Sequence, residues 1–148
     1  MSAAPAMDNG ISLYQAVILE RSRNPRFRRR LEGGGVLRAK CDNPLCGDQA
    51  AVELRLDSGG QIAEAGFSAD GCAILLASSD LMAETVCGLP ADQALAVGAA
   101  FEAMLAGGAD VSAPLLMNFA PLRGHPARRR CATLPWQALA TALAGEQV

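Results

Sequence analysis

The chain has 148 residues, which is enough for one compact domain and too few to expect two. Hydrophobic residues make up 51% of it and aromatic residues only 4%, so the core must be built mainly from aliphatic side chains. A formal net charge of −2 gives no overall attraction to nucleic acid or to an anionic membrane, and no stretch approaches the roughly 18 apolar residues of a spanning helix. The sequence therefore argues against nucleic-acid-binding and membrane proteins.

The first residues, 1–11, read as a disordered lead-in, and residues 12–145 as a single domain. Ser12 is expected to open a helix, because Gln15 three residues later completes a capping-box pattern. This helix should end at Asn24, since the residue before a proline avoids the helical conformation.

Three alternating segments then predict strands over residues 36–41, 52–57 and 61–69. The turn sequence Asp57-Ser58-Gly59-Gly60 predicts a hairpin between the second and third of these strands. Connections this short favour antiparallel pairing, because a parallel pair needs a long crossover.

The remainder of the chain reads as helical. Helices are expected over residues 72–87, from Pro90 to Gly107, and from Pro114 to about Leu122. A last helical stretch opens at Pro126, and Pro135 should kink or split it. The predicted fold class is α+β, with a small three-stranded antiparallel sheet and helices packed on one of its faces.

The five cysteines bear on function. No secretory signal peptide is recognisable at the N-terminus, which predicts a cytoplasmic protein with reduced cysteines. An odd number of cysteines agrees, since five cannot all pair. Reduced cysteines in such a chain serve as metal ligands, nucleophiles or buried apolar residues.

A tight loop is predicted around Cys46, because Pro44 and Gly47 flank it between two strands. Asp48 is two residues away, close enough for its carboxylate and the Cys46 thiolate to reach one cation. Cys72 begins a helix, where free backbone N–H groups favour a thiolate.

Cys131 follows three arginines, Arg128, Arg129 and Arg130, whose charges should also favour a thiolate. Three thiolates and one carboxylate suit the tetrahedral coordination of zinc. No Cys-x-x-Cys pair is present, however, so spacing alone leaves buried apolar cysteines as an alternative.

Two further cysteines and the single histidine are not predicted to act. Cys41 lies on the apolar face of its predicted strand and reads as structural, and Cys87 reads as a partly exposed non-ligand. His125 precedes a proline in a predicted loop and is assigned no catalytic role.

Taken together and in this order, four local sequences resemble the U-type iron–sulfur scaffold family, which comprises IscU, the N-terminal part of NifU, and SufU. They are Leu13-Tyr14 through Asn24-Pro25, Asn43-Pro44-Leu45-Cys46-Gly47-Asp48, Gly71-Cys72-Ala73-Ile74 with Ala77-Ser78-Ser79, and Arg130-Cys131-Ala132-Thr133-Leu134-Pro135-Trp136. The resemblance covers about residues 12–143 and implies a fold of the SufE/NifU type.

Two features resemble the SufU branch in particular. In IscU a histidine that can bind metal precedes the last cysteine, whereas this chain has Arg130, which stays protonated and cannot be a ligand. The stretch from Cys72 to Cys131 is also longer than in IscU and holds an extra helical segment. The resemblance implies Cys46, Asp48, Cys72 and Cys131 as metal ligands, with Arg128 at a basic position near the metal.

The resemblance implies a zinc-dependent sulfurtransferase in iron–sulfur cluster biogenesis, which accepts persulfide sulfur on Cys46 from a SufS-like cysteine desulfurase. Downstream iron–sulfur assembly proteins would be further partners. The alternative is a non-enzymatic scaffold on which the same ligands hold iron or a transient [2Fe–2S] cluster. A purely structural zinc domain, which would unfold without zinc, is a third possibility.

Overall fold

The computed structural model describes residues 15–45 and 47–145. In chain order its elements are α2 (Ala16–Arg23), β1 (Val36–Asn43), β2 (Asp48–Leu56), β3 (Ile62–Asp70), α3 (Ala73–Val86), α4 (Ala91–Leu105), the 3₁₀ helix η2 (Pro114–Gly124) and α5 (Pro126–Leu143). Helix α2 begins after Gln15 and ends at Arg23, with the predicted end Asn24 as its C-cap residue. The predicted lead-in and the capping residue Ser12 lie outside the described residues.

The three strands form one antiparallel sheet in the order β1-β2-β3, as the short connections predicted. Strands β1 and β2 pair without a shift, from Val36 opposite Arg55 to Asn43 opposite Asp48. Strand β2 therefore begins at Asp48, four residues before the predicted start, because the pairing continues almost to the turn. The predicted hairpin at Asp57–Gly60 is confirmed: the Asp57 N–H donates to the Gln61 carbonyl oxygen at 2.8 Å.

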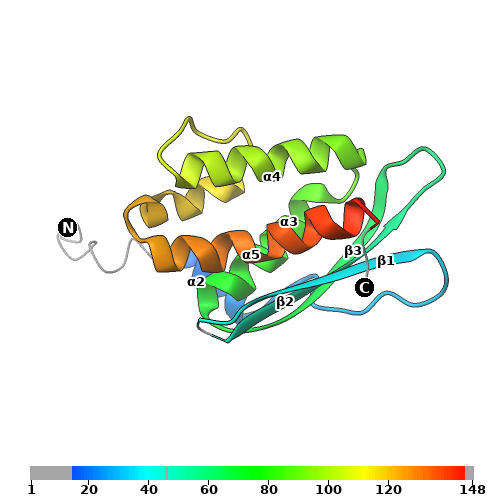
Figure 1. Cartoon of the computed structure of the whole chain (residues 1–148), viewed down its shortest axis with the longest axis horizontal. Coiled ribbons are helices and arrows are strands. Elements are labelled where there is room, and N and C mark those ends of the chain that lie inside the picture. Colours follow the sequence, from blue (N-terminus) through cyan, green and yellow to red (C-terminus); the bar gives the residue numbers. More distant parts are fainter. Residues whose placement is uncertain (1–14, 46, 146–148) are drawn as a thin grey trace.

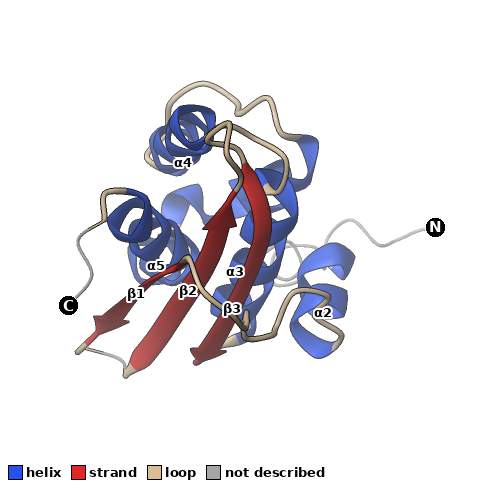
Figure 2. Ribbon diagram, turned by 90° about the vertical axis from the view of Figure 1, so that its right-hand side faces the viewer, coloured by secondary structure: helices blue, strands red, loops and turns tan. Residues whose placement is uncertain are grey.

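Helices cover one face of the sheet, which confirms the predicted fold class. Helix α5 packs on β1 and β2 and helix α3 packs on β3. Figure 1 shows three tiers, with the sheet below, α5 and α3 in the middle and α4 above, and Figure 2 shows the strands crossing α3 and α5. The side chains between the first two tiers are buried, among them Val52, Leu54 and Phe67. Within the described part of the chain, no helix is both long and apolar enough to cross a membrane.

Helix α5 runs as one helix from Pro126 to Leu143 with Pro135 inside it, so the helix is not split there. Proline in a helix interior removes one backbone hydrogen bond and costs about 3 kcal/mol. The cost is offset here by burial, since Leu134, Pro135 and Trp136 are all buried between the sheet and the outer helices. Packing on both sides of α5 holds the helix where the local sequence would break it.

A buried ion pair joins α2 to α3. Arg21 is 3% exposed and donates from Nε to Oδ2 of the fully buried Asp80 at 2.8 Å, and it also contacts Glu84. The other Asp80 oxygen accepts the backbone N–H groups of Arg26 and Phe27 at 2.8 and 2.7 Å. Burial raises the pKa of the Asp80 carboxyl, while these N–H groups and the Arg21 charge oppose the rise. Asp80 thus holds both α2 and the segment after it against α3.

Replacing Arg21 with methionine keeps the bulk of the side chain and leaves the Asp80 carboxyl buried without its cation. We expect the free energy of unfolding to fall by about 3–5 kcal/mol. Arg26→Met is the matched control, because the Arg26 side chain is 60% exposed and its ion pairs measure 4.0 Å. This control should cost less than about 1 kcal/mol. Urea denaturation measures both values, and equal effects would contradict a buried ion pair at Arg21.

Candidate metal centre

Three potential metal ligands meet where the sheet, α3 and α5 come together. Oδ2 of Asp48 lies 3.2 Å from Sγ of Cys131 and 3.9 Å from Sγ of Cys72. One ligand atom from each of these three residues can be chosen so that all lie within 4.8 Å of one another. Asp48 and Cys131 are buried and Cys72 is partly exposed, so the group lies just below the surface.

Asp48 reaches the site because of its register in the sheet. It is the first residue of β2. Its side chain points to the same face as those of Ala50, Val52 and Leu54, which are buried under the helices. Side chains two residues apart in a strand point to the same face. The carboxylate therefore points toward the helices and away from the open face.

Cys72 is the N-cap residue of α3, which places its sulfur at the end of the helix where backbone N–H groups lack intrahelical partners. Gly71 makes this approach possible, since a Cβ at Gly71 would lie 2.7 Å from Oδ1 of Asp48 and 2.6 Å from Leu75. Gly71 was not singled out as a site residue from the sequence. The only sequence signal for it is its place directly before Cys72.

Cys131 comes from the second turn of α5 and is 5% exposed. Helix α5 is held against α3 next to this residue, because the buried Ser78 hydroxyl donates to the Ala132 carbonyl oxygen at 2.5 Å. Ser78 therefore fixes the position of Cys131 relative to the helix that begins at Cys72.

The pKa values of the Cys72 and Cys131 thiols are shifted in opposite directions. A hydrogen bond from the Cys131 thiol lowers the pKa of Cys72 to about 6, with help from the backbone N–H groups of Leu75 and Ile74, while burial and the Asp48 charge oppose the shift. The same contact raises the pKa of Cys131, and burial and Asp48 raise it further. The cluster by itself thus favours a thiolate at Cys72 and a thiol at Cys131.

The sequence predicted that the three preceding arginines would favour a thiolate at Cys131. This prediction is wrong, because the pKa of the Cys131 thiol is raised. Arg128 and Arg130 are exposed, whereas Cys131 is buried on the sheet side of the helix. Arg129 donates to the carbonyl oxygens of Leu105 at 3.2 Å and Arg123 at 3.4 Å. The Arg129 guanidinium is therefore engaged by backbone carbonyl groups, and the pKa of Cys131 is raised by the Cys72 contact, burial and Asp48.

Cys46, the predicted fourth ligand and acting residue, lies outside the described residues. Its neighbour Leu45 is 84% exposed. A surface hollow of about 230 Å³ is lined by Leu45, Arg128, Arg130 and Cys131, so the predicted auxiliary residue Arg128 lies at the rim of the site.

The structure does not bring the other cysteines or the histidine into this group. Cys41 and Cys87 are partly buried against the hydrophobic core, and burial raises the pKa of each thiol. His125 is exposed and precedes α5 as its N-cap residue.

The three side chains fit a tetrahedral zinc ion. Zinc binds sulfur at about 2.3 Å and carboxylate oxygen at about 2.0–2.2 Å, which separates tetrahedral ligand atoms by roughly 3.5–3.8 Å. The sulfur–oxygen distances of 3.2 and 3.9 Å bracket this range. Two thiols and a carboxylate are also the donor types that zinc accepts.

Comparison with known proteins identifies the family. The model of the NifU-like N terminal domain matches residues 13–145. The zinc-dependent sulfurtransferase SufU of Bacillus subtilis is 33% identical over 139 residues, which cover 92% of each chain. The iron–sulfur cluster assembly scaffold protein IscU of Streptococcus pyogenes is 33% identical over 134 residues, covering 88% of this chain and 82% of that protein.

Solved structures share the whole fold. The crystal structure of an iron–sulfur cluster assembly scaffold protein for the SUF system from Fervidobacterium islandicum superposes with a TM-score of 0.80 at 31% identity, covering 88% of this chain and 96% of the other. The N-terminal part of a nitrogen-fixing NifU-like protein from Brucella abortus gives a TM-score of 0.81 at 27% identity, covering 94% and 95%. The chain therefore belongs to the NifU-like N-terminal domain family of iron–sulfur cluster assembly proteins.

Proposed function

We propose that this protein acts in iron–sulfur cluster assembly as a zinc-dependent sulfurtransferase that accepts sulfur from a cysteine desulfurase. The observation that carries the proposal is the meeting of Asp48, Cys72 and Cys131 beside the loop that contains Cys46. The 33% identity to the SufU sulfurtransferase of Bacillus subtilis, over 92% of each chain, supports it.

In this proposal Cys46, Asp48, Cys72 and Cys131 hold the zinc. When bound, zinc keeps its cysteine ligands deprotonated near neutral pH. Cys72 and Cys131 are anchored by α3 and α5 and act as the permanent holders. Asp48 is a harder ligand than the thiolates and exchanges more readily. Arg128 at the rim of the site provides a positive charge where a partner would approach.

The proposed reaction is a transfer of sulfur between two cysteines. The Cys46 thiolate attacks the outer sulfur of a persulfide carried by the desulfurase. A sulfur–sulfur bond forms at Cys46 as the persulfide bond of the partner breaks, and the partner cysteine leaves as a thiolate. No oxidant is needed, because the outer sulfur moves together with its oxidation state. The exposed position of Leu45 supports access of a partner to this loop.

An iron–sulfur scaffold is the second candidate, favoured by the equal identity to the IscU scaffold of Streptococcus pyogenes. The same four residues would hold a transient [2Fe–2S] cluster. Anaerobic reconstitution followed by transfer to an apo-ferredoxin separates the two functions. We expect little cluster transfer from this protein, and efficient transfer would favour the scaffold.

The ligand set predicts how metal affinity depends on single residues. Asp48→Asn, Cys72→Ser and Cys131→Ser should each weaken binding of Co²⁺, a coloured substitute for zinc, by at least roughly tenfold. Gly71→Ala should act in the same direction, because its Cβ would displace the Asp48 carboxylate.

Cys41→Ser and Cys87→Ser are the matched controls, since both lie outside the group and should leave affinity within about twofold. Thiolate-to-cobalt absorption measures the binding in every variant. A loss of affinity in the two controls equal to that in Cys72→Ser would refute the proposed ligand set.

A desulfurase assay tests the role of Cys46. The full-length protein should stimulate cysteine-dependent sulfide release by a SufS-like desulfurase, and Cys46→Ala should abolish the stimulation because the sulfur acceptor is gone. Cys87→Ala is the control and should stimulate normally. Thermal melting shows whether each variant is folded. Full stimulation by folded Cys46→Ala would eliminate the sulfurtransferase mechanism.

A further inference from the structure

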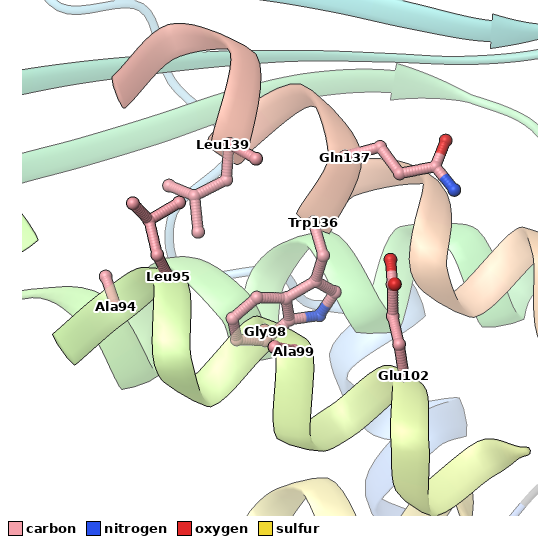
Figure 3. Close-up of a pocket in the computed structure, with 9 residues that line it drawn as sticks. Ala94, Leu95, Gly98, Ala99, Glu102, Trp136, Gln137 and Leu139 are labelled. Carbon is pink, nitrogen blue, oxygen red and sulfur yellow. The ribbon is translucent and has the colours of Figure 1, made fainter. Parts of the chain in front are cut away.

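A groove runs between α4 and α5, on the side of α5 that faces away from the sheet. Its deeper part is a hollow of about 300 Å³, lined by apolar side chains that include Leu95, Trp136 and Leu139 (Figure 3). Leu95 is one of the two exposed large hydrophobic residues in the described part of the chain, at 41% exposure. An apolar surface of this kind is typical of contact with another molecule.

Trp136 makes the hollow more than an apolar surface. The side chain is 3% exposed, yet its indole nitrogen, Nε1, has no hydrogen-bond partner among the described residues. In Figure 3 this nitrogen lies on the side of the ring that faces Glu102. A buried N–H without an acceptor is unfavourable, so a ligand that supplies an acceptor there binds more tightly than one that does not.

The indole ring is held rigidly. It packs against Phe101 with ring centroids 5.5 Å apart, and Gly98 lies so close that a Cβ there would be 3.0 Å from the ring. The N–H direction is therefore fixed before any ligand binds, which lowers the entropic cost of binding.

The polar groups around the hollow indicate the chemistry of its occupant. The exposed Glu102 carboxylate lies between Trp136 and the Gln137 amide in Figure 3, and all three side chains line the hollow. A carboxylate favours a basic side chain or an N–H donor, whereas the indole N–H requires an oxygen acceptor. A peptide backbone that is not in a helix offers such a carbonyl oxygen beside its side chains.

The shape of the groove favours a chain over a small molecule. A second hollow, of about 270 Å³, shares Glu102 and Gln137 with the first and continues toward Arg129. From Leu95 to Leu105 the helix rises by about 15 Å, the length of four or five residues of extended peptide.

We propose that the groove between α4 and α5 binds an extended peptide segment of a partner protein. An apolar side chain of this segment fills the hollow, its backbone carbonyl accepts the indole N–H of Trp136, and a neighbouring basic side chain lies beside Glu102. The site is separate from the metal centre, so the inference does not depend on the proposed sulfur transfer.

The single tryptophan of the chain makes the test direct, because its indole N–H gives one signal in a ¹⁵N–¹H correlation spectrum. The probe is the blocked pentapeptide acetyl-Gly-Lys-Leu-Gly-Gly-amide, added to the full-length ¹⁵N-labelled protein at millimolar concentrations. We expect the indole proton to shift downfield in a saturable manner as it gains an acceptor.

Two altered peptides test the apolar and charged contacts. Replacing the leucine by alanine should weaken binding by roughly tenfold or more, because about three buried carbon groups are lost. Replacing the lysine by glutamate should weaken it about fivefold, the effect of one exposed ion pair. Glu102→Gln should abolish the preference for lysine, whereas the control Asp92→Asn on the same helix should preserve it.

Trp136→Phe keeps an aromatic ring in the core and removes the donor. Followed through the backbone signals of Gly98 and Ala99, this variant should bind the lysine–leucine peptide about two- to tenfold more weakly. The proposal is overturned if the indole signal does not move, if all three peptides shift it equally, or if Glu102→Gln alone shifts it in the free protein. The last result would mean that Glu102 already accepts the indole proton.

Discussion

The structure depends on the packing of α3 and α5 side by side on one face of a small sheet. Each helix covers different strands, and the buried Ser78 hydroxyl joins α3 to α5 through the Ala132 carbonyl oxygen. Because proteins pack their interiors closely, helices held in this way have little freedom to slide. The candidate metal centre is built on this rigidity, since Cys72 and Cys131 come from the ends and turns of the two helices and Asp48 comes from the strand beneath them.

Without a metal, the centre is an unfavourable arrangement for its own side chains. Two thiols and a carboxylate lie close together, with Asp48 and Cys131 buried, and these neighbours and the burial raise the pKa of the Cys131 thiol. A divalent cation removes this conflict, because it favours deprotonation of both sulfurs and balances the carboxylate. The electrostatics of the group would therefore favour a bound cation at this position.

The outer helix α4 has a different relation to the fold. It contributes Phe101 and Met104 to the core, but it packs on α5 and η2 and not on the sheet. Leu95 and Glu102 of α4 line the same hollow as Trp136 of α5. The molecule thus offers two surfaces, one at the metal centre and one at the groove, that are connected through the same helix α5.

Local patterns in the sequence predicted the positions of the strands and of their connecting hairpin. Alternation located three strands, the Asp57–Gly60 turn located a hairpin, and the short connections required antiparallel pairing. The chain order of the cysteine motifs also pointed to the family, which the comparisons show. These features depend on residues close together in the chain, and a single sequence displays them directly.

The tertiary structure alone decided how distant residues act on one another. Pro135 is a helix breaker by its local chemistry, yet burial on both sides keeps α5 continuous. Arg129 lies near Cys131 in sequence, but its guanidinium donates to Leu105 and does not favour a thiolate. Only the fold brings Asp48 within 3.2 Å of a cysteine 83 residues away, because register and helix packing are set by the whole core and not by spacing.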